Sequence, residues 1–173
     1  MSAQTPKTPK SSEIVMTELV LPNDTNMLGN LLGGRLMHWI DIAAALAAMK
    51  HAGQICVTAS VDEINFDAPI RLGDVVKLYA SVNRAFRTSM EVGVKTVRMN
   101  AAGEEFPVNT AYLTFVALDE HRKPCPVPPL VPETPEEQRR FEEAGLRREM
   151  RLRHRQQIQQ YRQERGVNKP SSS

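Results

Sequence analysis

A run of alanine and other apolar residues at positions 36–49, LMHWIDIAAALAAM, is the feature that most constrains how this chain can fold. Alanine is the best helix former, and the apolar residues are not confined to one stripe, so we expect a helix enclosed by protein on most sides. The run is too short to span a bilayer, which takes about 20 residues. Gly33 and Gly34 immediately precede it, and Gly53 is a plausible end for the helix.

Five strand-like segments surround this helix in the sequence, one before it and four after it. They occupy residues 13–21, 55–66, 74–86, 89–99 and 108–118, and turn-forming residues separate them. One buried helix followed by a meander of strands predicts an α+β fold in which an antiparallel β-sheet wraps around a central α-helix.

The ends of the chain differ in character from this central part. Residues 1–12 are polar and contain proline, so we expect them to be disordered. Residues 13–130 form the predicted domain. Residues 131–173 continue the proline-rich segment CPVPPLVPETP, which should run extended over the surface, into a charged tail. Within it, residues 133–166 predict a helix that opens at the cap residue Thr134.

Composition and motifs exclude several classes of protein. No signal segment or membrane span is recognisable, and the two cysteines lack the spacing of a redox or metal motif, which favours a reducing cytoplasm. The four histidines are scattered, and the sequence lacks GxSxG, HExxH, nucleotide-loop and Rossmann patterns. We therefore expect no metal and no cofactor.

Asp41 is the only charged residue between Arg35 and Lys50. A buried carboxylate is costly without partners, so Asp41 either makes a structural hydrogen bond, touches solvent or carries chemistry. It lies eight residues after Gly33, about 12 Å along one helix, too far to share a reacting centre with that helix's own N-terminus. Two subunits with antiparallel helices could bring one Asp41 to the other Gly33. A general base would then face an oxyanion donor, as hydrolytic acyl transfer requires.

Several motifs resemble one family. The segment NMLGNLLGG (residues 26–34), with Asp41 seven residues later, resembles the active-site segment of hotdog-fold acyl-CoA thioesterases. Residues 57–76, 87–94 and 111–130 resemble the YciA-like and brain-type acyl-CoA hydrolase branch. The resemblance implies a hotdog fold, a double-hotdog dimer commonly assembled as a trimer of dimers (a homohexamer), and hydrolysis of acyl-CoA to free fatty acid and coenzyme A.

The resemblance also implies roles for particular residues. Asp41 matches the catalytic acid, which activates water or attacks the thioester directly. Gly33 matches the backbone N–H that polarises the thioester carbonyl, and Gly34 is expected to contact the substrate beside it. Asn26 matches a loop asparagine that acts from across the interface. Ser60 matches a hydroxyl position that assists in some relatives.

Two further observations bear on this assignment. Leu32 stands where several hotdog branches have a histidine, and this departure argues against a hotdog dehydratase. The phosphates of coenzyme A need cationic or N–H donors, and the candidates are Arg87, Thr88 and Ser89, although Arg87 could equally be a solvated surface charge.

Two other functions compete with hydrolysis. A hotdog protein can sense acyl-CoA and regulate transcription without catalysis, but the 12 residues before the first strand are too few for a DNA-binding module. Residues 147–165 carry seven arginines and two glutamates, which would suit nucleic-acid binding. We favour a solvated helix that packs on the oligomer surface and leaves catalysis to residues before 143.

Overall fold

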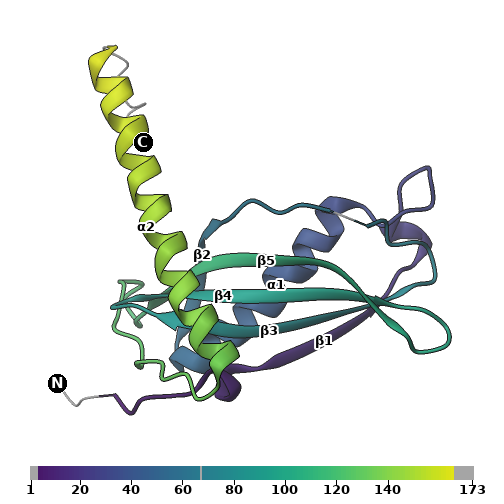
Figure 1. Cartoon of the computed structure of the whole chain (residues 1–173), viewed down its shortest axis with the longest axis horizontal. Coiled ribbons are helices and arrows are strands. Elements are labelled where there is room, and N and C mark those ends of the chain that lie inside the picture. Colours follow the sequence, from purple (N-terminus) through teal and green to yellow (C-terminus); the bar gives the residue numbers. More distant parts are fainter. Residues whose placement is uncertain (1–3, 67, 166–173) are drawn as a thin grey trace.

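A curled antiparallel sheet with one helix on each face forms the protein (Figure 1). The computed structural model describes residues 4–66 and 68–165. The sheet order is β1-β3-β4-β5-β2. Its helices and strands are 3-10 helices η1 (Pro9–Ser12) and η2 (Pro22–Asp24), helices α1 (Gly33–Ala52) and α2 (Pro135–Glu164), and strands β1 (Ile14–Leu19), β2 (Ile55–Val61), β3 (Val75–Ala85), β4 (Ser89–Met99) and β5 (Glu105–Leu118). The predicted α+β fold, a sheet wrapped around one helix, is confirmed.

Helix α1 lies against the inner face of the sheet and is longer than the apolar run that predicted it. It begins at Gly33 and ends where Gly53 adopts a left-handed conformation (φ 67°) and donates its N–H to the Met49 carbonyl at 2.8 Å. Small side chains face the sheet, which lets the helix backbone approach it closely. The fully buried ones are Ala43, Ala44, Ala47 and Ala48.

Strand β2 is an edge of the sheet and contains an irregularity. Thr58 pairs with Phe115 and Ser60 pairs with Thr114, so one extra residue, Ala59, interrupts the register. Such a β-bulge reverses which face the following side chains occupy. The strand ends at Val61, five residues earlier than predicted.

Residues 4–12 are ordered, in contrast to the disorder expected for residues 1–12. Lys7 forms a parallel bridge to Leu130, and its ammonium group donates to the His51 carbonyl at 2.6 Å. The hydroxyl of Ser12 is buried and accepts the Val82 N–H at 2.9 Å. The backbone partner of Lys7, at Leu130, belongs to the proline-rich connector. Residues 1–3 lie outside the described part of the chain.

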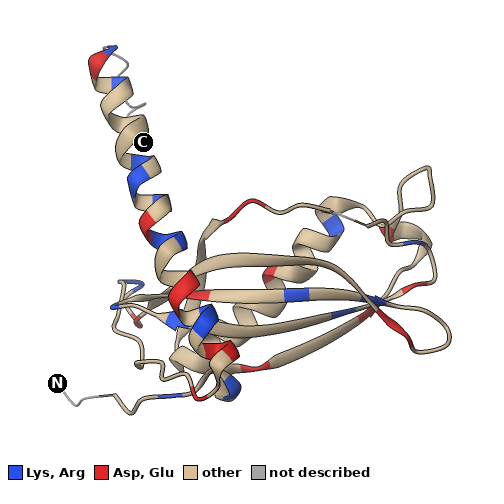
Figure 2. Ribbon diagram, viewed as in Figure 1, with Lys and Arg blue, Asp and Glu red and all other residues tan. Residues whose placement is uncertain are grey.

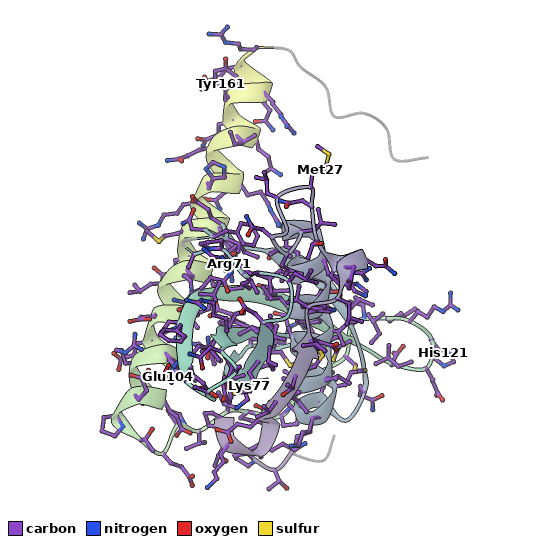
Figure 3. The ribbon with its side chains drawn as sticks, turned by 90° about the vertical axis from the view of Figure 1, so that its right-hand side faces the viewer. Met27, Arg71, Lys77, Glu104, His121 and Tyr161 are labelled. Atoms are coloured by element: carbon purple, nitrogen blue, oxygen red, sulfur yellow. The ribbon has the colours of Figure 1, made fainter. Side chains whose placement is uncertain are left out.

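Helix α2 crosses the outer face of the sheet and extends beyond its β2 edge (Figure 1). It starts as predicted, because Thr134 caps it in a capping box. Basic positions (blue) and acidic positions (red) are mixed along its ribbon (Figure 2). Tyr161 lies near its far end, well away from the sheet (Figure 3). No helix within the described ranges is long and apolar enough to cross a membrane.

Arginines of α2 contact the sheet of their own chain. The sequence predicts instead that this helix packs on the surface of the oligomer. Arg147 donates to both carboxylate oxygens of Glu91, and its shortest contact is 2.7 Å. Arg151 donates to Asp62 at 2.6 Å, just after β2. The Arg147 guanidinium also lies 3.6 Å from the centre of the Tyr112 ring. The Arg-rich stretch is therefore partly neutralised within the chain.

Candidate active site

Asp41 lies in the middle of α1, on the side that faces the edge strand β2. Its side chain is half-buried, and its Oδ1 accepts a hydrogen bond of 2.7 Å from the hydroxyl of Thr58. The Asp41 carboxylate makes no other hydrogen bond or ion pair in the part of the chain that the structure describes. One carboxylate oxygen is therefore held by a neutral donor, and Oδ2 is available to bind or deprotonate another molecule.

The bulge at Ala59 explains why Thr58, and not Ser60, reaches Asp41. Thr58 pairs with Phe115, a fully buried core residue, so its side chain shares the inner face with α1. Ser60 pairs with Thr114 on the outer face. Without the bulge, the two hydroxyls would lie on the same face. Sequence reasoning missed Thr58 because the alternation of side chains along β2 gives no sign of the extra residue.

The second part of the site is the N-terminus of α1. Leu32 caps the helix without a side-chain hydrogen bond, and its own N–H donates to the Asp24 carbonyl at 2.8 Å. Arg35 and Leu36 both donate their N–H groups to the Leu32 carbonyl. Among the described residues, no hydrogen bond uses the N–H groups of Gly33 and Gly34, as is usual in a first helical turn.

The protein's own packing does not require glycine at either position. Neither Gly33 nor Gly34 has a positive φ. A Cβ atom at Gly33 would meet the Phe66 ring at 3.6 Å, an ordinary contact, and one at Gly34 would meet nothing within 4 Å. The absence of a side chain instead leaves the first helical N–H groups open to close approach by another molecule.

A mostly apolar cavity of about 390 Å³ adjoins this helix end. The loop before the helix and residues 68–70 lie on two sides of it. The Leu31 N–H links these two segments because it donates to the Ile70 carbonyl at 2.7 Å. The residues that line the cavity are Asn30, Leu31, Gly33, Leu36, Phe66, Ala68, Pro69 and Ile70.

Asn26 shapes the loop in front of α1. Its side-chain oxygen accepts the N–H groups of Leu28 at 2.9 Å and Asn30 at 3.2 Å. Gly29 supports the same turn with a φ of 74°. Met27 projects fully exposed from the loop tip (Figure 3). The oxygen of Asn26 is therefore engaged, and its amide group remains able to donate.

One chain does not bring all of these groups together. Asp41 and Gly33 are on the same helix, separated by about 12 Å along its axis. Arg87 and Thr88 lie in the turn between β3 and β4, Ser89 begins β4, and the Thr88 carbonyl accepts the N–H of Ala117. Ala117 pairs with the start of β2, so this turn lies near the C-terminal end of α1 and away from Gly33.

An exposed apolar surface surrounds Asp41. Large apolar side chains on the outward side of α1 and along the edge strand are accessible to solvent. They are Met37, Ile42, Leu46 and Met49 on α1 and Val61 on β2, whose partner Leu113 is on the inner face, whereas the exposed Ile55 and Val57 lie on the outer face of the same edge strand. A patch of this kind along an edge strand is typical of a protein–protein interface.

Other chemistry at this surface is disfavoured. Burial raises the pKa of the Cys56 thiol to about 11, and nearby Cys125 adds to the effect, so Cys56 carries little thiolate at neutral pH. Burial lowers the pKa of His51, whose Nε2 lies 2.9 Å from the Pro128 carbonyl, away from the surface. In residues 4–66 and 68–165, no group of His, Cys, Asp and Glu side chains could hold a metal ion.

Comparison with known proteins identifies the family. Residues 28–100 match the thioesterase superfamily. The chain is 46% identical over 142 residues to acyl-coenzyme A thioesterase 11 of Mus musculus, covering 82% of this chain but only 24% of the mouse protein. It is 44% identical to the uncharacterized acyl-CoA thioester hydrolase YkhA of Bacillus subtilis, covering 78% of this chain and 80% of the relative.

Solved structures agree with this relationship. An acyl-CoA hydrolase variant from Staphylococcus aureus in complex with coenzyme A superposes with a TM-score of 0.88 at 36% identity, covering 95% of this chain and 99% of that chain. Its structures include variants in which an asparagine, an aspartate or a threonine is replaced by alanine. A hexameric acyl-CoA thioesterase matches with a TM-score of 0.83 at 42% identity, covering 87% and 97% of the two chains. The chain belongs to the thioesterase superfamily.

Proposed function

We propose that the protein hydrolyses acyl-CoA to a free fatty acid and coenzyme A. The observation that carries this proposal is the Asp41 carboxylate, held through one oxygen by Thr58 in an otherwise apolar and exposed surface. Membership of the thioesterase superfamily and the acyl-CoA thioesterase relatives support the substrate class. Asparagine, aspartate and threonine, the residue types replaced in the Staphylococcus aureus variants, are also those of Asn26, Asp41 and Thr58.

The proposed site is shared between two subunits. If the β2 edges and the exposed sides of α1 pair about a two-fold axis, Asp41 of one subunit meets the helix N-terminus of the other. The pairing would also cover the apolar residues that surround Asp41. The dimer is then the minimal active unit, and assembly of dimers into a hexamer follows the hexameric relative.

Each group has a defined task in the reaction. The Gly33 N–H donates to the thioester carbonyl oxygen and stabilises the negative charge that forms there. Asp41 takes a proton from water as the water oxygen attacks the carbonyl carbon, and the C–S bond then breaks. The proton passes to the departing coenzyme A thiolate, so the products are a carboxylic acid and a thiol.

A second route uses the same groups. Asp41 attacks the carbonyl carbon itself, coenzyme A leaves, and water hydrolyses the resulting mixed anhydride. Thr58 is a positioning residue in both routes, because its hydroxyl holds Oδ1 and directs Oδ2 toward the reactant. Single-turnover hydrolysis in ¹⁸O-water tests for the second route: label in Asp41 shows an anhydride that water opens at the Asp41 carboxyl carbon, because the general-base route labels only the product acid.

The remaining assignments follow from position. The apolar cavity next to Gly33 would receive the acyl chain, with Gly34 at its entrance, and Asn26 would donate its amide across the interface. The turn of Arg87, Thr88 and Ser89 would meet the coenzyme A portion of a substrate bound between subunits. We place the enzyme in the cytoplasm because both of its cysteines are free thiols.

The decisive experiment is a thioesterase assay on Asp41→Asn across acyl chain lengths, with release of free thiol as the readout. We expect turnover to fall by at least about a hundredfold, the usual size of a general-base contribution. Glu120→Gln, at an exposed position in the turn after β5, is the matched control and should keep wild-type activity. A folded Asp41→Asn protein with activity within a few-fold of wild type would remove Asp41 from the mechanism.

A further inference from the structure

A small cavity of about 120 Å³ lies on the outer face of the sheet, where α2 crosses β2 and β5. It is on the opposite face from Asp41, because Ser60 and Thr114 point outward while Thr58 points inward. The residues that line it are Ala59, Ser60, Phe86, Thr114, Arg148, Arg151, Leu152 and Arg155. We call it the outer cavity. None of the groups proposed for hydrolysis lies in it.

The outer cavity has an excess of positive charge. Of the arginines that α2 brings to this part of the sheet, Arg147 and Arg151 are paired with Glu91 and Asp62. Arg148 and Arg155 make no hydrogen bond or ion pair within the described ranges, and the Arg148 guanidinium lies over the Phe86 ring, 4.4 Å from its centre. Two guanidinium groups are therefore left to bind an anion.

Hydroxyl groups complete the lining. The Thr114 Oγ1 atom is shielded from solvent and has no hydrogen-bond partner in the part of the chain that the structure describes. Buried hydroxyl groups are usually paired, so the Thr114 hydroxyl has unused hydrogen-bonding capacity beside the cavity that it lines. The bulge at Ala59 turns the Ser60 hydroxyl to the same face.

We propose that the outer cavity binds a phosphate group. Arg148 and Arg155 would donate to its oxygens, since guanidinium groups recognise phosphate through paired N–H donors, and the hydroxyls of Thr114 and Ser60 would complete its hydrogen bonds. The cavity is well below the roughly 300–1,000 Å³ of sites for whole small molecules, so only the phosphate enters and the rest of the ligand lies outside. The phosphate comes either from coenzyme A or from a separate phosphorylated metabolite.

Binding is measured by calorimetry without turnover, so the result does not depend on the proposed hydrolysis. The probes are inorganic pyrophosphate, coenzyme A and pantetheine, which lacks phosphate. We expect pyrophosphate to bind the wild-type protein more weakly as salt is raised, and the double variant R148Q/R155Q to bind it about tenfold more weakly or worse. Arg153→Gln removes one positive charge from the same helix at an exposed position outside the cavity and should bind as wild type.

Thr114→Val leaves every arginine in place and should also weaken pyrophosphate binding, which keeps the test sound if the double variant folds poorly. If the phosphate is that of coenzyme A, R148Q/R155Q weakens binding of coenzyme A and not of pantetheine, and pyrophosphate competes with coenzyme A. If it is a separate metabolite, pyrophosphate binds equally well at saturating coenzyme A. Absence of pyrophosphate binding to the wild type, or equal binding by R148Q/R155Q and Arg153→Gln, would overturn the proposal.

Discussion

Replacement of Arg147 by methionine tests how α2 is held to the sheet. Glu91 lies in β4 with a relative exposure of 0%, and its carboxylate is covered by α2. Arg147 is its principal partner, with contacts of 2.7 Å and 3.2 Å. Methionine keeps much of the aliphatic packing of arginine and removes the charge, so Arg147→Met leaves a buried carboxylate that has lost its main counter-ion.

The structure gives the size of the effect. Removal of one partner from a buried ion pair costs about 3–5 kcal/mol. Glu91 retains Asn83 Nδ2 at 3.3 Å and Arg151 Nη1 at 3.5 Å, and these weaker contacts offset part of the loss. A cost of about 2–3 kcal/mol remains. For a chain of this length each kcal/mol lowers Tm by roughly 2–4 °C, so we expect Tm to fall by roughly 4–12 °C.

Thermal and urea unfolding at a fixed protomer concentration measure this loss, because the stability of an oligomer depends on concentration. Arg153→Met, at an exposed position on the same helix, is the matched control and should lie within about 0.5 kcal/mol of wild type. The double variant Arg147→Met with Glu91→Met removes the buried charge and should recover much of the stability. An Arg147→Met protein as stable as the control would refute the view that this ion pair fixes α2.

Three further predictions concern the site and the tail. Thr58→Val should lower kcat about tenfold with little change in KM, and Thr58→Ser, which restores the hydroxyl, should recover most of it; steady-state kinetics check both. Mixed oligomers of Asp41→Ala and Asn26→Ala subunits should regain activity if one site draws on two chains, and no recovery after proven subunit exchange would place the chemistry in one chain. Truncation after residue 143 should destabilise the domain, since it leaves Glu91 and Asp62 without their arginines. Truncation after residue 155 keeps these arginines and should preserve both stability and turnover. Unfolding and thioesterase assays compare the two truncated proteins.

The sequence contained the information for the central helix and for the two ends of the proposed site. Asp41 could be found because a charge inside an apolar helix is costly, and Gly33 because paired glycines precede that helix. Both signals are local, so periodicity and composition carry them. The fold class followed in the same way from one helix and a series of strand-like runs.

Features that depend on contacts distant in the sequence were not predictable. The bulge at Ala59, which selects Thr58 over Ser60, depends on how β2 pairs with β5. The ordering of residues 4–12 depends on Lys7 and Ser12 finding partners far along the chain. The tail looked solvated because arginine is usually exposed, and only the tertiary structure shows that Arg147 covers the buried Glu91.

The buried alanines of α1 restrict which substitutions the helix can accept. Those buried alanines set the separation between the helix and the sheet, and the hydrogen bond from Thr58 to Asp41 joins the same two layers at 2.7 Å. A larger side chain at Ala44 or Ala48 would push the layers apart, and a shift of about 1 Å exceeds the usual reach of such a bond. Mutations in the core, remote from any reactant, therefore affect catalysis by changing the distance between the Thr58 hydroxyl and the Asp41 carboxylate. Selection on turnover should keep small residues at these positions even where the fold itself would accept valine.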